Sequence, residues 1–336
     1  MKKIIVMCSM LISFTLNAQT DSVNILSEIY VNASITKPND PISQTKIDMK
    51  LFKSIYQGQD LPVIMNFSNS SITFYSDGGG YNGYVYFRMR GVDQTKINAT
   101  LNGVPLNEPE DQGFYSSNFP DFFSNISSIQ IQRGVGTSSN GTASFIGSLN
   151  FQSPSLTDSA YTKLEIGKGS FNTNRYSMVV NTGLKNGFGT YIRYSNIGSD
   201  GYREKSSTLG NTLFLSTGYQ DSKNILKYTM FYGTSRNKMA WMPSNEADIK
   251  VNRRNNPLTK DENDFFTQNM NILSYSRFVN KHTSFNVSTF YNILDGNYDI
   301  NFNNDSIFNY KLRSNYYGIS ANLNYVYSKV DISMGI

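Results

Sequence analysis

From about residue 159 onward, apolar and polar side chains alternate along the chain with a period of two. In residues 225–234, for example, one face carries large apolar or aromatic groups, and the other carries Lys227, Thr229 and Gly233. A period of two predicts β-strands. The strands predicted from this pattern lie near 160–168, 174–184, 188–198, 207–219, 224–234, 265–279, 283–294 and 313–327, with a ninth beginning at Val330.

The connections between these runs fall into two classes. Residues 185–187, 221–224 and 280–282 are tight turns, whereas 199–206, 235–264 and 295–312 are long and polar. Short and long connections strictly alternate, which is typical of a membrane β-barrel with short turns at one end and longer loops at the other. A secreted β-sandwich or propeller is the alternative. It explains the period of two but not the two classes of connection.

The N-terminus has the features of a cleaved secretory signal peptide over residues 1–19. Lys2 and Lys3 precede an uncharged, mostly apolar run that ends at Leu16, and residues 16–18, followed by Gln19, offer a small-residue cleavage site. The apolar run is too short to cross a hydrocarbon core of about 30 Å. The mature chain is therefore expected outside the cytoplasm.

Composition agrees with a β-structure that has one face in lipid and the other in water. Charged residues make up 16% of the chain, below the roughly 25% usual in soluble proteins, and there are 23 Tyr and 22 Phe. One His and one Cys exclude most Cys/His metal sites and triad catalysis. We therefore predict no enzyme activity, metal site or cofactor. Removal of Lys2 and Lys3 lowers the formal charge from +5 to +3, which argues against a nucleic-acid partner.

Residues 20 to about 155 follow a different pattern, in which short apolar runs alternate with connections rich in Gly and Asn. Three short strands are expected, each ending in a turn that contains Gly. The pair Asn102-Gly103 is typical of a hairpin turn. The residues expected to fix these turns are Arg90, Gly91, Asn102, Gly103, Pro105, Arg133, Gly134, Gly141 and Gly147.

The order of these motifs is similar to that of the plug domain of TonB-dependent outer-membrane receptors. The pattern is Arg-Gly at 90–91, Leu-Asn-Gly-Val-Pro at 101–105, a strand ending in Arg-Gly at 133–134 and a Gly- and Ser-rich return at 141–150. The resemblance implies a plug inside a barrel of about 22 strands in outer-membrane lipid. It also implies energy delivered by TonB with the inner-membrane ExbB/ExbD complex.

The resemblance gives the expected organisation of the chain. A signal peptide at 1–19 precedes a periplasmic segment at 20–44, an α+β plug domain at 45–155 and an incomplete antiparallel transmembrane β-barrel at 156–336. The barrel part would hold about eight strands and the start of a ninth, so we expect the sequence to be an N-terminal fragment. Residues 26–33 resemble the TonB box, an exposed segment that pairs with TonB by strand addition. The box residues are Glu28, Ile29, Tyr30, Val31 and Asn32; an ordinary first plug strand is the alternative.

Ligand contact is expected at the outward loops 75–83 and 107–117 and at the long loop 235–264. The candidates are Tyr75, Asp77, Tyr81, Glu108, Asp111, Phe114, Tyr115, Trp241, Arg253 and Arg254. Aromatic and Arg groups suit a small organic anion such as a metal chelate, and solvated loops are the alternative. In the family, plug arginines pair with barrel carboxylates, which gives Arg88, Arg90 and Arg133 a structural docking role.

The function implied by the resemblance is active import of a scarce nutrient, above all a ferric siderophore. Cobalamin, haem and oligosaccharide are alternative cargoes with the same mechanism. A surface recognition or adhesin barrel without transport is the alternative from another class, and a functional TonB box distinguishes the two classes.

Overall fold

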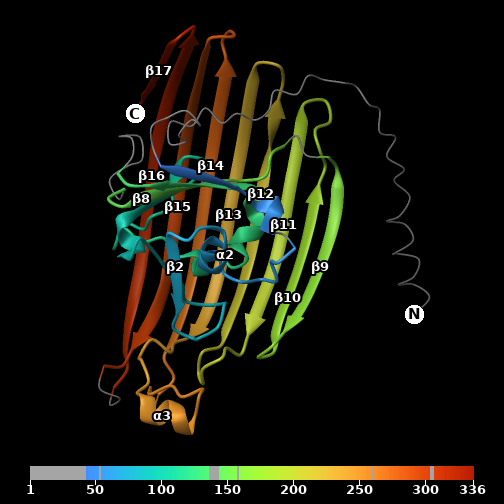
Figure 1. The fold of residues 1–336 in the computed structure, drawn as a ribbon. Coiled ribbons are helices and arrows are strands. Elements are labelled where there is room, and N and C mark those ends of the chain that lie inside the picture. Colours follow the sequence, from blue (N-terminus) through green and yellow to red (C-terminus); the bar gives the residue numbers. More distant parts are fainter. Residues whose placement is uncertain (1–42, 53, 136–143, 157–158, 259, 303–305) are drawn as a thin grey trace, which may run out of the picture.

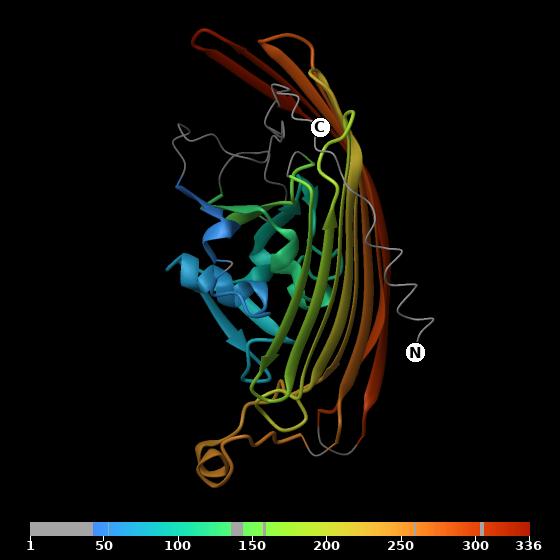
Figure 2. The ribbon, with the colours of Figure 1, turned by 90° about the vertical axis from the view of Figure 1, so that its right-hand side faces the viewer.

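The computed structural model describes residues 43–52, 54–135, 144–156, 159–258, 260–302 and 306–336. The signal peptide, the TonB-box-like segment and Gly141 lie outside these residues. Two parts are visible in Figure 1: a small α+β part at the N-terminal side and a large curved sheet. Figure 2 shows that the α+β part lies against the concave face of that sheet.

In the residues that the structure describes, the α+β part contains two small sheets and one α-helix. Its elements are β1 (Gln44–Asp48), η1 (Met49–Phe52), α2 (Leu61–Ser68), β2 (Ile72–Ser76), β3 (Val85–Met89), β4 (Val92–Asp93), η2 (Gln94–Lys96), β5 (Ile97–Leu101), β6 (Val104–Pro105), η3 (Ser116–Asn118), η4 (Phe122–Asn125), β7 (Ser128–Arg133) and β8 (Gly147–Gln152). One sheet has the order β1-β7-β8-β5-β6, in which only β5 and β8 are parallel, and the other has the order β2-β3-β4.

Glycine and asparagine turns act as the sequence predicts. Asn102 and Gly103 both have positive φ, +50° and +82°, and join β5 to β6 through the pair Leu101–Val104. Arg90 and Gly91 make the same kind of turn between β3 and β4. Two consecutive positive-φ residues match the twist of a tight hairpin, which is why Asn-Gly predicts it. These turns bring apolar side chains of β3, β5, β7 and β8 into one core.

The large sheet is a nine-stranded antiparallel meander in which every strand pairs with its sequence neighbour. Its strands are β9 (Tyr161–Gly169), β10 (Thr173–Asn181), β11 (Phe188–Ser199), β12 (Thr208–Gln220), β13 (Asn224–Lys238), β14 (Asn263–Phe278), β15 (Thr283–Ile300), β16 (Phe308–Tyr327) and β17 (Val330–Gly335). The predicted fold class, an α+β plug followed by antiparallel barrel strands, is confirmed by this architecture.

The burial pattern along these strands is the inverse of that in a soluble protein, because polar side chains are buried and apolar side chains are exposed. On β13, Lys227 and Thr229 are buried against the α+β part, whereas Leu226 is 45% exposed on the opposite face. On β10, Ser177 is buried and Met178 is 50% exposed. A polar lining and an apolar outer face are the arrangement of a transmembrane barrel wall.

The sequence overestimates the difference between the two classes of connection. The segment 295–312 was expected to be one long loop, but β15 continues to Ile300 and β16 begins at Phe308. Polar residues such as Asp295 and Asn297 are paired across this ladder, so polarity does not mark a loop here. At the same end of the sheet, residues 170–172 form a tight turn with positive φ at Phe171 and Asn172. Between the described strands of this sheet, the longest connection is 239–262, which holds α3 (Glu246–Val251).

No helix in the described part of the chain is long and apolar enough to span a bilayer.

Candidate ligand mouth and plug contacts

The loop between β2 and β3, residues 77–84, is the tip of the plug and points toward the end of the sheet that carries α3 (Figures 1 and 2). It lies against the connections 200–207 and 239–262. A Cβ atom at Gly78 would lie 3.2 Å from Ser206, and one at Gly79, where φ is +68°, would lie 3.0 Å from Tyr202. The glycine run therefore serves close packing of backbone against a barrel loop, not phosphate binding.

Arg203 holds this tip in place, and we call its set of bonds the apex contact. Its five N–H donors all find acceptors in neighbouring segments. The acceptors are Asp77 O at 3.1 Å, Asn255 O at 3.1 Å, Met242 O at 2.8 Å, Ser244 Oγ at 3.0 Å and, closer still, Ala240 O. The Arg203 backbone N–H also donates to Gly78 O at 3.0 Å. One side chain thus joins the plug tip to the 239–262 loop.

Two of the expected ligand residues on that loop serve the same packing. Arg254 Nε donates to Tyr202 O at 2.5 Å, and its guanidinium lies 5.4 Å from the Phe171 ring centroid. Trp241 Nε1 donates to Glu262 Oε2 at 2.7 Å. Arg253 is exposed. Arg254 thus joins the 239–262 connection to the 200–207 connection, Trp241 closes a bond within 239–262, and Arg253 lies exposed on the same loop.

Four tyrosines form a cluster beside the tip. The Tyr75 and Tyr86 rings stack at 5.0 Å, Tyr84 stacks on Tyr86 at 5.8 Å, and Tyr115 meets Tyr86 edge-on at 6.3 Å. Arg88 lies 5.2 Å from the Tyr75 ring centroid. The sequence singled out Tyr75 and Tyr115 but missed Tyr84 and Tyr86. Tyr86 lies opposite Tyr75 in the ladder of β2 and β3, and Tyr84 lies two residues before it, just ahead of β3; this spacing is the signal that identifies them.

Carboxylates flank the tyrosine cluster. Tyr86 OH donates to Asp77 Oδ2 at 3.2 Å, and Tyr115 OH donates to Asp111. Burial raises the pKa of the Asp77 carboxyl, and burial also raises the pKa of the Tyr86 phenol. Tyr81 is exposed and meets Phe74 edge-on at 5.9 Å. The expected residues Tyr75, Asp77, Tyr81, Asp111 and Tyr115 therefore do gather at one end of the plug.

Phe114 and Glu108 do not lie on this surface. Phe114 is 2% exposed and packs against Phe122 and Phe151, with centroids 5.3 and 5.6 Å away, so it is a core residue. Glu108 is 5% exposed and accepts a bond from Asn118 Nδ2 at 2.8 Å. Burial, with Asp111 and Glu110 nearby, raises the pKa of Glu108 to about 8. The sequence of the loop 107–117, which is acidic and aromatic, is typical of a solvated loop. It contains no signal that the loop packs against the large sheet.

The expected docking of plug arginines on barrel carboxylates is not found among the described residues. Arg133 Nε donates to Ser43 Oγ at 2.9 Å, Arg88 lies over Tyr75, and Arg90 is exposed in its turn. Within the described residues, none of the three forms an ion pair with a barrel carboxylate. The polarity is reversed, because the plug supplies a carboxylate and the sheet supplies the arginines.

That carboxylate is Asp121, and we call Asp121, Glu165, Arg175 and Arg193 the ion-pair cluster. Arg175 binds Asp121 through two bonds, Nε to Oδ1 and Nη2 to Oδ2, both 3.0 Å. Arg193 Nη1 lies 2.9 Å from Glu165 Oε2 and 4.0 Å from Asp121 Oδ2.

Hydroxyl groups complete the coordination of Asp121. Ser195 Oγ donates to it at 2.6 Å, Ser124 Oγ donates at 2.9 Å, and Tyr56 OH donates as well. Its side chain is 0% exposed. Two carboxylates and two guanidinium groups balance, so the buried charge is compensated.

No group of three or more His, Cys, Asp or Glu side chains in the described ranges is arranged to hold a metal ion.

The fold and these contacts define a class of protein, a barrel wall with a globular plug bound to its polar face. Residues 37–148 match the family model described as TonB-dependent Receptor Plug Domain. No curated protein matches the chain. Residues 37–148 thus belong to the plug-domain family of TonB-dependent receptors.

Solved structures share the arrangement of plug and sheet seen in this chain. The ferric-catecholate import receptor Fiu from E. coli matches with a TM-score of 0.69 at 15% identity, over 88% of this chain and 48% of that one. The ferric yersiniabactin uptake receptor FyuA from Yersinia pestis matches with a TM-score of 0.72 at 12% identity, over 88% and 48%. The copper transporter OprC matches with a TM-score of 0.70 at 13% identity, over 90% and 46%. The chain therefore spans less than half the length of these structures and has their fold.

Proposed function

We propose that the complete receptor imports a ferric siderophore across the outer membrane by TonB-dependent transport. The observation that carries the proposal is the position of the plug on the concave, polar face of the sheet (Figure 2). A plug in the lumen of a barrel blocks the passage of bulky solutes, so transport requires the plug to move. Such movement needs an energy source outside the barrel, which in this family is TonB with ExbB/ExbD.

Siderophore cargo is supported by the mouth and by the neighbours. The tyrosine cluster beside the plug tip, together with Arg88, forms the candidate ligand mouth. Its aromatic rings and its guanidinium suit an aromatic or anionic chelate. Fiu and FyuA are named for ferric-chelate uptake, whereas OprC is named for copper. Cobalamin, haem and oligosaccharide remain alternative cargoes of the same mechanism.

TonB is proposed to pair with residues 28–32 by strand addition, which depends on main-chain hydrogen bonds. Proline removes an N–H donor and fixes φ. Tyr30→Pro in the complete receptor should therefore abolish uptake of a labelled ferric siderophore and leave its binding to the cell surface intact. Asn24→Pro, which lies ahead of the box, is the matched control and should leave both quantities unchanged.

Each other outcome has a distinct meaning. Uptake that survives Tyr30→Pro would refute TonB coupling through this segment. Loss of surface binding as well would place the segment in the folded plug. If cobalamin, haem or an oligosaccharide binds and none of the tested ferric chelates does, the proposed cargo would be wrong and the proposed mechanism would stand. Surface binding of any ligand with no uptake at all would favour a recognition barrel.

A further inference from the structure

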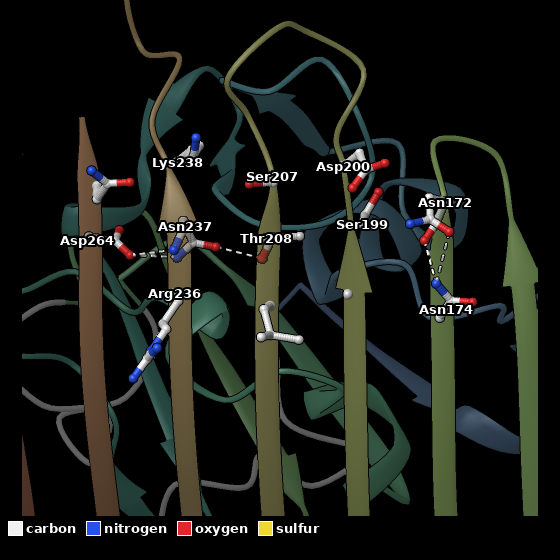
Figure 3. A pocket seen from close by; sticks show the side chains of 13 residues that line it. Asn172, Asn174, Ser199, Asp200, Ser207, Thr208, Arg236, Asn237, Lys238 and Asp264 are labelled. Carbon is white, nitrogen blue, oxygen red and sulfur yellow. Dashed lines mark hydrogen bonds between the residues drawn. The ribbon is translucent and has the colours of Figure 1, made fainter. Parts of the chain in front are cut away.

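A depression of about 460 Å³ lies at the ends of β10 to β14 near the plug tip, and Figure 3 looks into it. In that view the plug ribbon lies behind the strands, so the depression opens on the face of the sheet turned away from the plug. The ligand mouth described above is on the other side of the wall. The depression therefore belongs to a different surface with different neighbours.

One row of directly opposite residues builds this surface. The strand registers join Asn174 to Gly198, Gly198 to Leu209, Leu209 to Arg236 and Arg236 to Phe265. Gly198 has no side chain, which leaves the gap between Asn174 and Leu209. A Cβ atom there would lie 3.3 Å from Leu209 Cδ1, so the gap is narrow at its floor.

The row lies just beyond the apolar band of the outer face. Four residues further along the same strands, the outward row is Met178, Tyr194, Leu213 and Tyr232. Four strand residues correspond to about 13 Å along the strand. Aromatic girdles mark the boundary of the hydrocarbon in barrels. The depression is thus at the level of lipid headgroups rather than of acyl chains.

The lining has the chemistry of a sugar site with two cations, Arg236 and Lys238. Amide, hydroxyl and carboxylate groups come from Asn172, Asn174, Ser199 and Asp200, and Leu209, 48% exposed, adds an apolar surface. Arg236 is exposed, and its guanidinium lies 5.0 Å from the Phe265 ring centroid.

Arg236 differs from Lys238, two positions further on, in its lack of a carboxylate partner among the described residues. Lys238, which also lines the depression, has Asp261 at 2.7 Å. In the part of the chain that the structure describes, no carboxylate lies within ion-pair distance of Arg236. A guanidinium binds phosphate oxygens through two parallel bonds and is held flat by an aromatic face.

We propose that this depression binds the headgroup of a phosphorylated glycolipid in the outer leaflet, with Arg236 on a phosphate and Asn174 and Asp200 on sugar hydroxyls. The acyl chains then follow the apolar band over Leu213 and Tyr232. The inference rests on the membrane position in the proposed function, since only a membrane brings a lipid to this face. A free anion would use Arg236 but would gain nothing from the apolar band below.

The test uses the complete receptor purified in mild detergent and a phosphorylated, acylated glucosamine disaccharide in mixed micelles as the probe. Arg236→Gln should weaken binding about tenfold, because the phosphate loses a charge-assisted pair. Gly198→Val should weaken it to a similar degree by filling the gap without changing charge. Arg313→Gln is the matched control. Arg313 is an exposed cation on β16, away from the depression and 3.5 Å from Asp295, and the substitution should leave binding unchanged.

The outcomes separate the site from the proposed function. Equal binding by the wild-type receptor, Arg236→Gln and Gly198→Val would refute the site. Full displacement of the lipid by inorganic phosphate would show an anion site and refute the glycolipid. Loss of binding with Arg236→Gln but not Gly198→Val would likewise refute a shaped headgroup site. Recovery of the wild-type receptor from the soluble periplasmic fraction would refute the membrane position, and with it the proposed function.

Discussion

The plug meets the sheet through two contacts of opposite chemistry. In the ion-pair cluster, Asp121 is fully buried and is bound by two guanidinium bonds and three hydroxyl groups. In the apex contact, Arg203 is half-buried and donates only to backbone carbonyls and one hydroxyl. One contact compensates charge with charge, and the other satisfies a charge with neutral acceptors.

The difference matters for the proposed transport, in which the plug has to move. Breaking a buried ion pair leaves uncompensated charge in a dry site, which costs several kcal/mol. Carbonyl acceptors at a half-exposed tip can exchange an Arg donor for water at much lower cost. The ion-pair cluster therefore fixes the plug on β9 to β11, whereas the apex contact can rearrange when a ligand arrives at the mouth.

Removing the charge of Asp121 should have the largest effect. Asp121→Asn leaves Arg175 and Arg193 with Glu165 as their only carboxylate and should destabilise the plug by about 3–5 kcal/mol. The backbone is not disturbed, because Asn tolerates the φ of +62° at this position. Hydrogen exchange of plug amides in the complete receptor measures the change.

Asp111→Asn is the control for this prediction. Asp111 accepts bonds from Tyr115 OH and Gly113 N, both within the plug, so the substitution should change plug stability by less than about 1 kcal/mol. Because the cluster is buried, the effect of Asp121→Asn should be similar at low and high salt. Equal losses for the two variants would show that the ion-pair cluster is no special anchor.

The ion-pair cluster also shows what the sequence could and could not predict. Strands were predictable because an apolar exposed face and a polar face turned to the plug impose a strict period of two, as Met178 and Ser177 illustrate. Turns at Asn102 and Asn186 were predictable because positive φ selects Asn and Gly. Neither signal says which polar residues of the inner face meet which plug residue.

The features that the sequence did not predict depend on tertiary contacts. Asp121 and Arg175 are far apart in sequence, and the pattern marked Arg175 and Arg193 only as members of a polar face. Phe114 lies between acidic and aromatic residues that are on the surface, yet it turns into the core. Strand β15 outruns its apolar part to Ile300, because paired strands continue past the apolar band. Pairing partners and depth are decided by packing, which a single sequence does not encode locally.

Weakening the apex contact should have a smaller and more local effect. Arg203→Lys keeps the charge but offers at most three N–H donors in place of five. At least two acceptors are left to water, so residues 239–258 should exchange amide hydrogens roughly thirtyfold faster, about 2 kcal/mol. Plug core amides such as those of Ile129 and Leu149 should be unaffected.

Arg253→Lys is the matched control for this variant, since Arg253 is exposed on the same loop. It should leave exchange unchanged throughout the loop. If Arg203→Lys instead loosened the plug core as much as Asp121→Asn does, the two contacts would belong to one cooperative unit, and the distinction between an anchor and a rearrangeable contact would fail.

Glu108 offers the finest test, because it buries a carboxyl group with an amide as its partner in place of a cation. Its pKa is raised to about 8, first by burial and then by Asp111 and Glu110. The folded plug therefore binds a proton that the unfolded chain releases above its ordinary value near 4.5. Stability is then greatest below that value and falls as the pH rises toward 8, by about 1 kcal/mol per pH unit. Glu108→Gln mimics the protonated form and keeps an acceptor for Asn118 Nδ2, so it should flatten this slope between pH 5 and 8 in denaturant unfolding of the plug. An unchanged slope would mean that Glu108 is ionised in the folded plug, and that a charge can be buried at this interface without an arginine.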